Sequence, residues 1–211
     1  MDFAVPHRDI LDYWFGDGGG DEGETIGTES WPPSSLRRRW FKSSPGQDAE
    51  IGEYFGDRVA AALRRDLVDW EREPGPRLAL ILLLDQFTRN IHRGEAQAFA
   101  GDHHAATLTL EGLSTGMDRR LGWAGQVFFY MPLMHAEEMT LQERAVSCYQ
   151  DLHQRVPAGL KDEIANNLKF AEEHRDIIQR FGRFPHRNRV LQRADSAEER
   201  DFLQHARRYG Q

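Results

Sequence analysis

Apolar residues recur at helical spacing along the whole chain, and no segment shows the strict alternation that a half-buried strand requires. The longest apolar run, Leu78 to Leu84, fits either a buried strand or a buried helix by its period alone. Because no partner strand is found elsewhere, we interpret this run as part of a central helix from Arg77 to Ile91. The sequence therefore predicts an all-α fold.

Proline, glycine and capping residues mark where the helices begin and end. Pro6 suits a helix start, Gly16 suits its end, and Gly182 suits the end of the clearest helix. We expect eight or nine helices joined mostly by short loops, so that neighbours in sequence pack as antiparallel pairs. The expected ranges are 6–15, 34–41, 48–70, 77–91, 97–113, 118–130, 141–153, 161–181 and 196 to the tail.

Two kinds of local signal refine these boundaries. Thr140 with Glu143, and Ser196 with Glu199, have the spacing of a capping box, in which each side chain bonds to the other residue's backbone N–H. Pro132 lacks a backbone N–H, so we expect it to break the helix before it.

The length of 211 residues suits one all-helical domain over residues 1–211. Residues 16–30 are rich in glycine and acid and nearly free of large apolar side chains, so we expect a flexible loop there. Cys148 is the one cysteine and falls on an apolar helix stripe, which predicts a buried structural thiol. The absence of a disulfide pair, of a signal-peptide pattern and of a long apolar run indicates a soluble cytoplasmic protein.

Charge and missing motifs exclude several function classes. A net charge of -7 argues against a general binder of nucleic acid or of anionic membranes. The chain has no phosphate loop, dinucleotide fingerprint, zinc-binding helix motif, nucleophile elbow or paired CxxC. His135, Glu137, His174 and His186 could supply metal ligands, but no pair has i, i+4 spacing on one helix. We therefore expect no tightly bound metal and no cofactor.

The first of three polar segments that border apolar sequence is LLLLDQFTRNIHR. Asp85 follows the most hydrophobic stretch of the chain directly, so its carboxylate starts from a buried helix. Arg89 lies four residues on, and Arg93 one turn further on the same side. A structural ion pair between Asp85 and Arg89 and a ligand site both fit this pattern.

The second polar segment is FFYMPLMHAEEM, with His135 and Glu137 among methionine, leucine and aromatic residues. A histidine beside a carboxylate can act as a general base with its orienting partner. A hydrogen-bonded core histidine is the structural alternative.

The third polar segment covers the end of the 161–181 helix and the turn after it. His174 falls inside the apolar stripe of that helix. Between Ile177 and Ala194 there are five arginines, one histidine and no acid, which reverses the overall sign of the protein locally. The polar residues of the turn are Arg183, His186, Arg187 and Asn188. Surface arginines without a ligand are the structural alternative.

The same segments carry a resemblance to a known family. LLLDQFTRNIHRGEAQAFAGD, FFYMPLMHAEE and IIQRFGRFPHRN resemble the bacterial uncharacterised family known as domain of unknown function 924, over nearly the whole chain. The resemblance implies a tetratricopeptide-like right-handed superhelix of antiparallel helix pairs, and it implies no activity. Thr88 stands where the family often has proline, and Gln192 stands where it has a glycine. By position, the family's polar signature falls on Asp85, Gln86, Arg89, Asn90, Arg93, Asp102, His135, Glu137, His174, Arg183, His186, Arg187 and Asn188.

Three functional hypotheses follow from these segments. The first is a binding module that holds a small anionic ligand or a peptide carboxylate. The second is a hydrolase-type enzyme with His135, His174 or His186 as base and Glu137 or Asp85 as orienting group. The third is a polar core with a purely structural role. The candidate ligand-binding residues are Asp85, Arg89, Arg93, His135, Glu137, His174, Arg183, His186, Arg187 and Asn188.

We expect the three segments to meet around one cavity, because buried charges persist when they are paired. Asp85 and Glu137 supply two negative charges, and Arg89, Arg183 and Arg187 supply three positive charges. Pooling them leaves one positive charge in excess, which suits an anionic ligand better than a closed network.

Overall fold

The computed structural model describes residues 7–16, 31–32, 34–41 and 44–205. Within these ranges the chain is all-α, as predicted, with no strand. Residues 17–30 of the predicted flexible loop lie outside the described residues. The helices are α1 (His7–Phe15), α2 (Ser34–Phe41), α3 (Pro45–Leu63), α4 (Pro74–Ile81), α5 (Thr88–Ile91), α6 (Asp102–Ser114), α7 (Trp123–His135), α8 (Met139–Arg155), α9 (Lys161–Phe181) and α10 (Ala197–His205).

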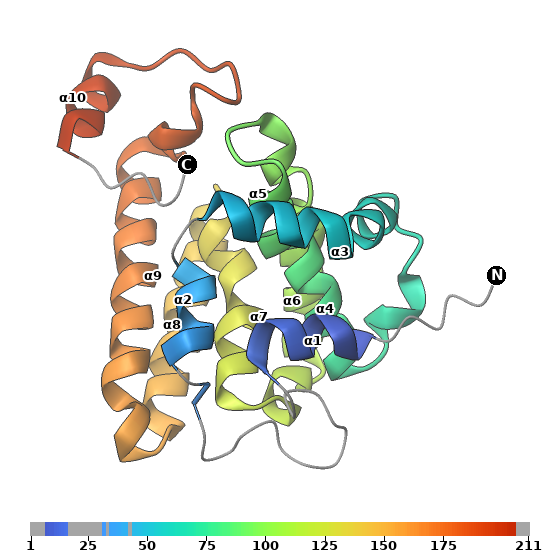
Figure 1. Ribbon diagram of the computed structural model, residues 1–211. Helices are drawn as coiled ribbons and strands as arrows, with labels where there is room; N and C mark the ends of the chain where they lie inside the picture. The colour runs from blue at the N-terminus through green and yellow to red at the C-terminus, as the bar shows by residue number, and fades with distance from the viewer. Residues whose placement is uncertain (1–6, 17–30, 33, 42–43, 206–211) are drawn as a thin grey trace.

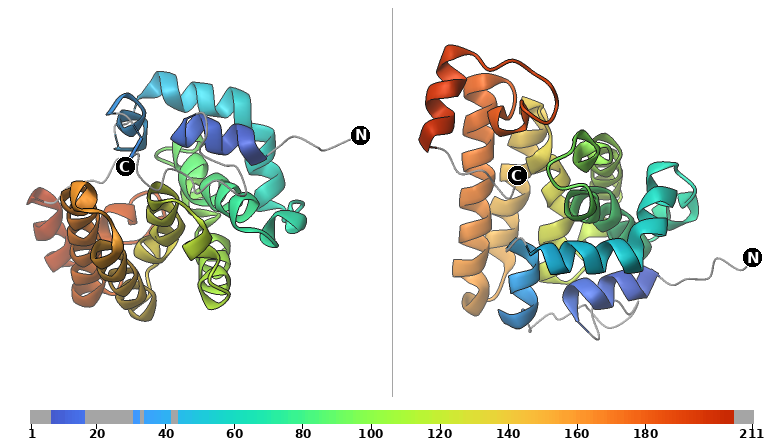
Figure 2. Two further views of the ribbon diagram at one scale, coloured as in Figure 1. Left: turned by 90° about the horizontal axis from the view of Figure 1, so that it is seen from below. Right: turned by 45° about the horizontal axis from the view of Figure 1, so that its top comes forward.

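Helices α6 to α9 stand side by side, and α1 to α3 lie across one face of this layer (Figures 1 and 2). Helices α8 and α9 form the most extensive pair and run antiparallel, as expected for neighbours joined by a short connection. After α9 the chain turns over one end of the layer toward α5 and then enters α10 (Figure 1). Whether the pairs form a right-handed superhelix stays a prediction. No helix of the described residues is long and apolar enough to cross a membrane.

Helix α7 is the centre of the hydrophobic core. All its residues from Ala124 to Met134 are buried, so this part of the helix has no solvent-exposed face. Phe128 is surrounded by aromatic rings of the N-terminal helices, with ring centroids 5.6 Å from Trp14 and 4.8 Å from Trp40. Such edge-to-face contacts add to the burial of apolar area and fix α1 and α2 against α7. Cys148 of α8 is buried, as predicted, and burial raises the pKa of its thiol to about 11.

The predicted central helix contains a π-helical segment, Leu82–Phe87, between α4 and α5. The backbone N–H of Thr88 donates to the carbonyl of Leu83, five residues earlier. The hydroxyl of Thr88 donates to the carbonyl of Leu84 at 2.6 Å, so the wider turn leaves that buried acceptor with a partner. π-Helical turns inside α-helices are frequent at functional sites, and this one carries Asp85.

Two predicted helix ends are wrong. Helix α3 ends at Leu63 instead of residue 70, because Arg65 adopts a positive φ of 64° and residues Val68–Glu71 form a separate 3₁₀ turn. Pro132 does not end its helix: α7 begins at Trp123 and continues to His135. Burial on every side of α7 outweighs the missing N–H of the proline.

The capping signals gave mixed results. Ser196 and Glu199 make both reciprocal capping-box bonds at the start of α10, and Gly182 ends α9 with a positive φ of 68°, both as predicted. The predicted box at Thr140 is wrong, because α8 already begins at Met139 and the Thr140 hydroxyl bonds to Glu138.

Gly101 brings the start of α6 against the π-helical segment. A Cβ at this position would overlap the carbonyl group of Leu84, with the carbonyl carbon 2.9 Å away. Backbone atoms of a buried helix cannot move aside cheaply, so only glycine allows this approach. The approach places Asp102, the first residue of α6, beside the π-helical segment.

We expect Gly101→Ala to lower the free energy of unfolding by about 2 kcal/mol or more, because the added methyl group overpacks two backbone segments. Urea denaturation of the purified variant measures this difference. Gly52→Ala is the matched control: a Cβ at Gly52, in the middle of α3, has no atom within 4 Å. The control should be neutral or stabilising by up to about 1 kcal/mol. Equal changes in the free energy of unfolding for the two variants would contradict the close approach of Gly101 to Leu84.

Candidate functional site

Asp85 and His135 form the centre of the candidate site. Asp85 comes from the π-helical segment and His135 is the last residue of α7, and Oδ1 of Asp85 lies 2.7 Å from Nδ1 of His135. The Asp85 side chain is only 1% exposed, and the amide of Gln86 donates to its second oxygen at 2.6 Å. Burial alone would raise the pKa of Asp85, but the nearby Arg89 and His135 outweigh it and hold that pKa well below its usual range.

A chain of ion pairs extends from Asp85 across four elements. Arg89 of α5 lies 3.2 Å from Oδ1 of Asp85 and 2.9 Å from Oδ1 of Asp102. Arg187, in the 3₁₀ turn Pro185–Arg187, lies 3.2 Å from Oδ2 of Asp102 and donates to the carbonyl of His135 at 2.9 Å. We call Asp85, Arg89, Asp102, His135 and Arg187 the buried cluster.

Arg187 is held between two phenyl rings. Its guanidinium carbon lies 4.5 Å from the ring centroid of Phe99 and 4.5 Å from that of Phe184. Stacking on two rings stabilises a desolvated cation, by about 2 kcal/mol for a favourable pair. The side chain is 7% exposed, and its Nε atom is buried without a hydrogen-bond partner. Burial lowers the pKa of Arg187 to about 10, so it is still a cation at neutral pH.

His174 and His186 lie next to the buried cluster. The ring centroid of His174 is 6.2 Å from that of His135, and both His174 and His186 pack at 5.4 Å from Phe184. Nδ1 of His174 donates to the carbonyl of Phe170 at 2.8 Å. Burial lowers the pKa of His174 to about 3 and that of His186 to about 4, with nearby cations and His135 contributing. Both rings are therefore neutral at pH 7.

Glu137 attaches residues 182–196, which we call the C-terminal segment, to the end of α7. Its carboxylate accepts two bonds from Arg193, at 2.6 and 2.9 Å, and one from the backbone N–H of Phe184 at 2.8 Å. Arg193 also donates to the side chain of Asn188. These bonds fix the segment that carries Arg187. Gln192, at the position where the family has glycine, adopts a positive φ of 54° in this segment.

Two predicted site residues are paired elsewhere. Arg183 makes a two-bond pair with Glu199 of α10, at 2.7 and 2.8 Å, and Arg93 pairs with Asp48 of α3 at 2.7 Å. The expected excess of positive charge is therefore wrong for the geometry observed. In the buried cluster, Asp85 and Asp102 balance Arg89 and Arg187, and Glu137 balances Arg193 separately.

The structure also brings in residues that our reasoning from the sequence did not place in the site. Asp102 appeared only in the family's polar signature, since an aspartate at a helix start is usually a cap. Phe99 and Arg193 had no distinguishing signal, because an isolated aromatic residue and one of several arginines are common on any surface. Among the described residues, no group of three or more His, Cys, Asp or Glu side chains is arranged to hold a metal ion.

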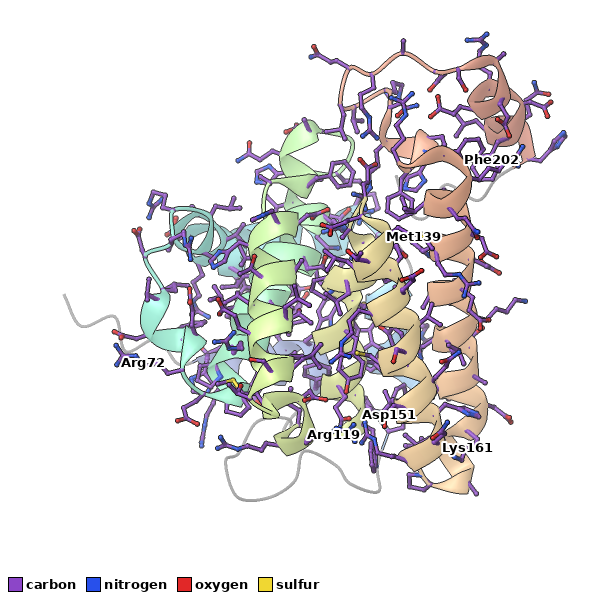
Figure 3. All side chains as sticks on the ribbon, turned by 180° about the vertical axis from the view of Figure 1, so that it is seen from behind. Arg72, Arg119, Met139, Asp151, Lys161 and Phe202 are labelled. Atoms are coloured by element: carbon purple, nitrogen blue, oxygen red, sulfur yellow. The ribbon has the colours of Figure 1, made fainter. Side chains whose placement is uncertain are left out.

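A second polar network lies at the end of the helix layer away from the C-terminal segment (Figure 3). Met139 and Phe202 lie at the end of the layer that carries the C-terminal segment, and Arg119, Asp151 and Lys161 lie at the opposite end. Arg119 and Asp151 pair at 2.7 Å there, and both side chains are more than two-fifths exposed. Such exposed pairs contribute little to stability, in contrast to the buried cluster.

Two comparisons place the chain among known proteins. A family profile described as "Bacterial protein of unknown function (DUF924)" matches residues 10–207. A solved structure of a protein of unknown function from Agrobacterium tumefaciens is 36% identical, covers 95% of this chain and 97% of that chain, and has a TM-score of 0.76. No curated protein matches the sequence. Neither match brings a ligand or an activity, so function has to be argued from the geometry.

We expect Asp85→Asn to lower the free energy of unfolding at pH 7 by about 3 kcal/mol or more, because it removes one charge of a buried network. A carboxylate with a depressed pKa stabilises the fold above about pH 4, and that contribution is lost as the pH falls further. The difference in the free energy of unfolding between Asp85→Asn and the unmutated protein should therefore become smaller below about pH 4. Asp66→Asn removes a carboxylate from an exposed pair with Arg64 and should change stability by less than about 0.5 kcal/mol. Urea denaturation over this pH range measures both.

Proposed function

The chain belongs to the bacterial family DUF924, and we propose that it binds a small anionic ligand at the buried cluster. Arg187 and His135 are the groups that contact the ligand, and Asp85, Arg89 and Asp102 position them. Glu137 and Arg193 hold the C-terminal segment in place beside them. Arg93 and Arg183 are not part of this site, because their guanidinium groups pair with Asp48 and Glu199.

The observation that carries the proposal is the Nε atom of Arg187. A buried donor without an acceptor costs about 1–3 kcal/mol, and more when the group is charged. The phenyl rings of Phe99 and Phe184 hold the guanidinium plane in place, so the side chain cannot rotate freely to find a partner. An anionic oxygen supplied by a ligand would remove this cost, and a fixed guanidinium loses little entropy on binding it.

The exposure of the cluster favours a small ligand over a peptide. The side chains of Arg89, Asp102 and His135 are 14–16% exposed, so the cluster meets solvent only at its edge. A peptide bound through its carboxylate needs an extended groove for the rest of its chain. A small anion needs only enough exposed surface at the edge of the cluster to reach it.

A second function is favoured by the 2.7 Å contact between Asp85 and His135. A carboxylate that accepts the Nδ1–H of a histidine leaves Nε2 as a general base. In a hydrolytic reaction His135 would take a proton from water as the water oxygen bonds to an ester carbonyl, and would return it to the departing alcohol. Turnover of small esters that His135→Asn abolishes, with the fold retained, would establish this activity.

We expect at least one anion among acetate, benzoate, phosphate and sulfate to raise the melting temperature, with chloride at equal ionic strength as the reference. Saturation at about 100 times Kd adds about 2.7 kcal/mol, or several degrees for a chain of this size. Arg187→Lys keeps the charge but loses Nε and the planar guanidinium group with its paired N–H donors. It should therefore raise Kd about tenfold or more. Thermal-shift titration of each anion gives both the rise in melting temperature and Kd.

Arg183→Lys is the matched control, because Arg183 lies four residues away in the same segment and pairs with Glu199. It should bind the anion with an unchanged Kd. If no anion shifts the melting temperature, or if both variants weaken binding equally, the cluster is structural and the proposed site is wrong.

A further inference from the structure

We propose that residues 184–193, which we call the lid loop, open to let the anion reach Arg187 and are held closed by Glu137. This inference rests on the proposed anion site and concerns how access to that site is regulated. The lid loop carries Arg187 in its 3₁₀ turn, and it lies between α9 and α10 at one end of the helix layer (Figure 1).

The Nε atom of Arg187 is out of reach of a ligand while the lid loop is closed. The atom is buried, and the whole side chain is only 7% exposed. The phenyl rings of Phe99 and Phe184 cover the guanidinium group. Its two terminal nitrogens donate to Asp102 and to the carbonyl of His135. An anion can meet the exposed edge of the buried cluster, but it contacts Nε only after one of these groups moves.

The groups that face Arg187 from the helix layer are fixed by the backbone that carries them. His135 is the last residue of α7, which is buried along its length. Phe99 and Asp102 lie on either side of Gly101, whose backbone is in close contact with the carbonyl group of Leu84. Moving any of these three side chains away would disturb a packed helix end. The movement that exposes Nε therefore belongs to the lid loop.

The lid loop has few apolar contacts that would resist opening. Within the described part of the chain, the main hydrophobic core includes no residue of this loop. Its Phe184 packs with Ile177 and Ile178 of α9 in a separate, smaller cluster. Segments with few buried apolar contacts open locally at a lower free energy than the core. The lid loop can therefore open while the helix layer stays folded.

The two ends of the lid loop are suited to a hinge. Gly182 adopts a positive φ of 68° just before the loop, and Gln192 adopts a positive φ of 54° near its end. A left-handed conformation strains a residue other than glycine, so the closed loop holds strain at Gln192. Arg183 ties the ends together, since it donates to the carbonyl of Ala194 at 2.9 Å and to Glu199 at 2.7 Å. The loop thus leaves and re-enters the protein at one place, as an Ω-loop does, and Arg183 stays at its base.

Glu137 holds the lid loop closed. Its carboxylate accepts two bonds from Arg193 and one from the backbone N–H of Phe184, so it contacts both ends of the loop. The side chains of Glu137 and Arg193 are each 24% exposed, so water and salt reach this pair, whereas Asp85 is 1% exposed. An ion pair at such a position can break and re-form without exposing the core. Glu137 is therefore a positioning residue that sets how often the loop opens.

Labelling with phenylglyoxal, which reacts with accessible guanidinium groups, measures this opening in the ligand-free protein. Arg77 is the internal control: it is 6% exposed, as Arg187 is, but it donates to the carbonyls of Glu71 and Leu108, away from the lid loop. Labelling of Arg77 reports opening of the core, whereas labelling of Arg187 reports opening of the loop. We expect Arg187 to be labelled at least about tenfold faster than Arg77, as measured by peptide mass spectrometry.

One substitution tests the role of Glu137. Glu137→Gln keeps the shape of the side chain but removes its charge, so it should raise the labelling rate of Arg187 about tenfold. The labelling rate of Arg77 should not change. Glu198→Gln is the matched control, because Glu198 of α10 pairs with Arg180 at 2.7 Å outside the lid loop, and it should change neither rate. The comparison of Arg187 with Arg77 in the unmutated protein needs no variant, so it tests the opening even if Glu137→Gln does not fold.

The outcomes distinguish this inference from the proposed function. If Arg187 is labelled no faster than Arg77, the lid loop does not open by itself and the inference is overturned, even if an anion raises the melting temperature. Equal effects of Glu137→Gln and Glu198→Gln would overturn the role of Glu137. If Arg187 is labelled faster than Arg77 but acetate, benzoate, phosphate and sulfate all leave its rate unchanged, the loop opens but the proposed anion site is wrong. Slower labelling of Arg187 in one of these anions supports both the site and the lid loop.

Discussion

The buried carboxylate of Asp85 is the constraint on which the site depends. It extends from an apolar helix into the interior, where an unpaired charge would cost several kcal/mol or more. Arg89, one helical turn on, and His135, at the end of α7, supply the pairing. Arg89 is then a buried cation that needs a second acid, and Asp102 meets that need. The need to pair one acid thus links three helices.

The C-terminal segment completes the same network from outside the helix layer. Arg187 contributes the last cation, and it donates hydrogen bonds to the carboxylate of Asp102 and to the carbonyl of His135. Glu137 holds this segment through Arg193, and Arg183 ties it to α10 through Glu199. These three arginine–carboxylate pairs therefore have different roles. The pairs of Arg193 and Arg183 attach the segment to the rest of the protein, and the pair of Arg187 places a cation inside the candidate site. The contacts made by each arginine decide which role it has.

Much of the fold could be predicted because its signals are local. Helical periodicity, the glycine at position 182 and the capping box at Ser196 act within a few residues of chain, and all three are found as expected. The buried stripe that places Cys148 and His174 inward follows from the same period. Two predictions of helix ends failed. Pro132 lies inside a helix that is buried on every side, where packing overrides local preference, and α3 ends at Leu63, two residues before Arg65 adopts a positive φ.

The sequence by itself determined that the chain is all-α, that Asp85 starts from a buried helix, and that three polar segments adjoin apolar sequence. The tertiary structure alone decided which charges meet. Five arginines lie between Ile177 and Ala194, and nothing local distinguishes Arg187 from Arg183. Their partners, Asp102 and Glu199, lie 85 residues before one and 16 residues after the other. Coulombic pairing depends on distance in space, and helical period carries no information about that distance between segments so far apart. Which charges balance one another in the site is therefore a property of the folded chain.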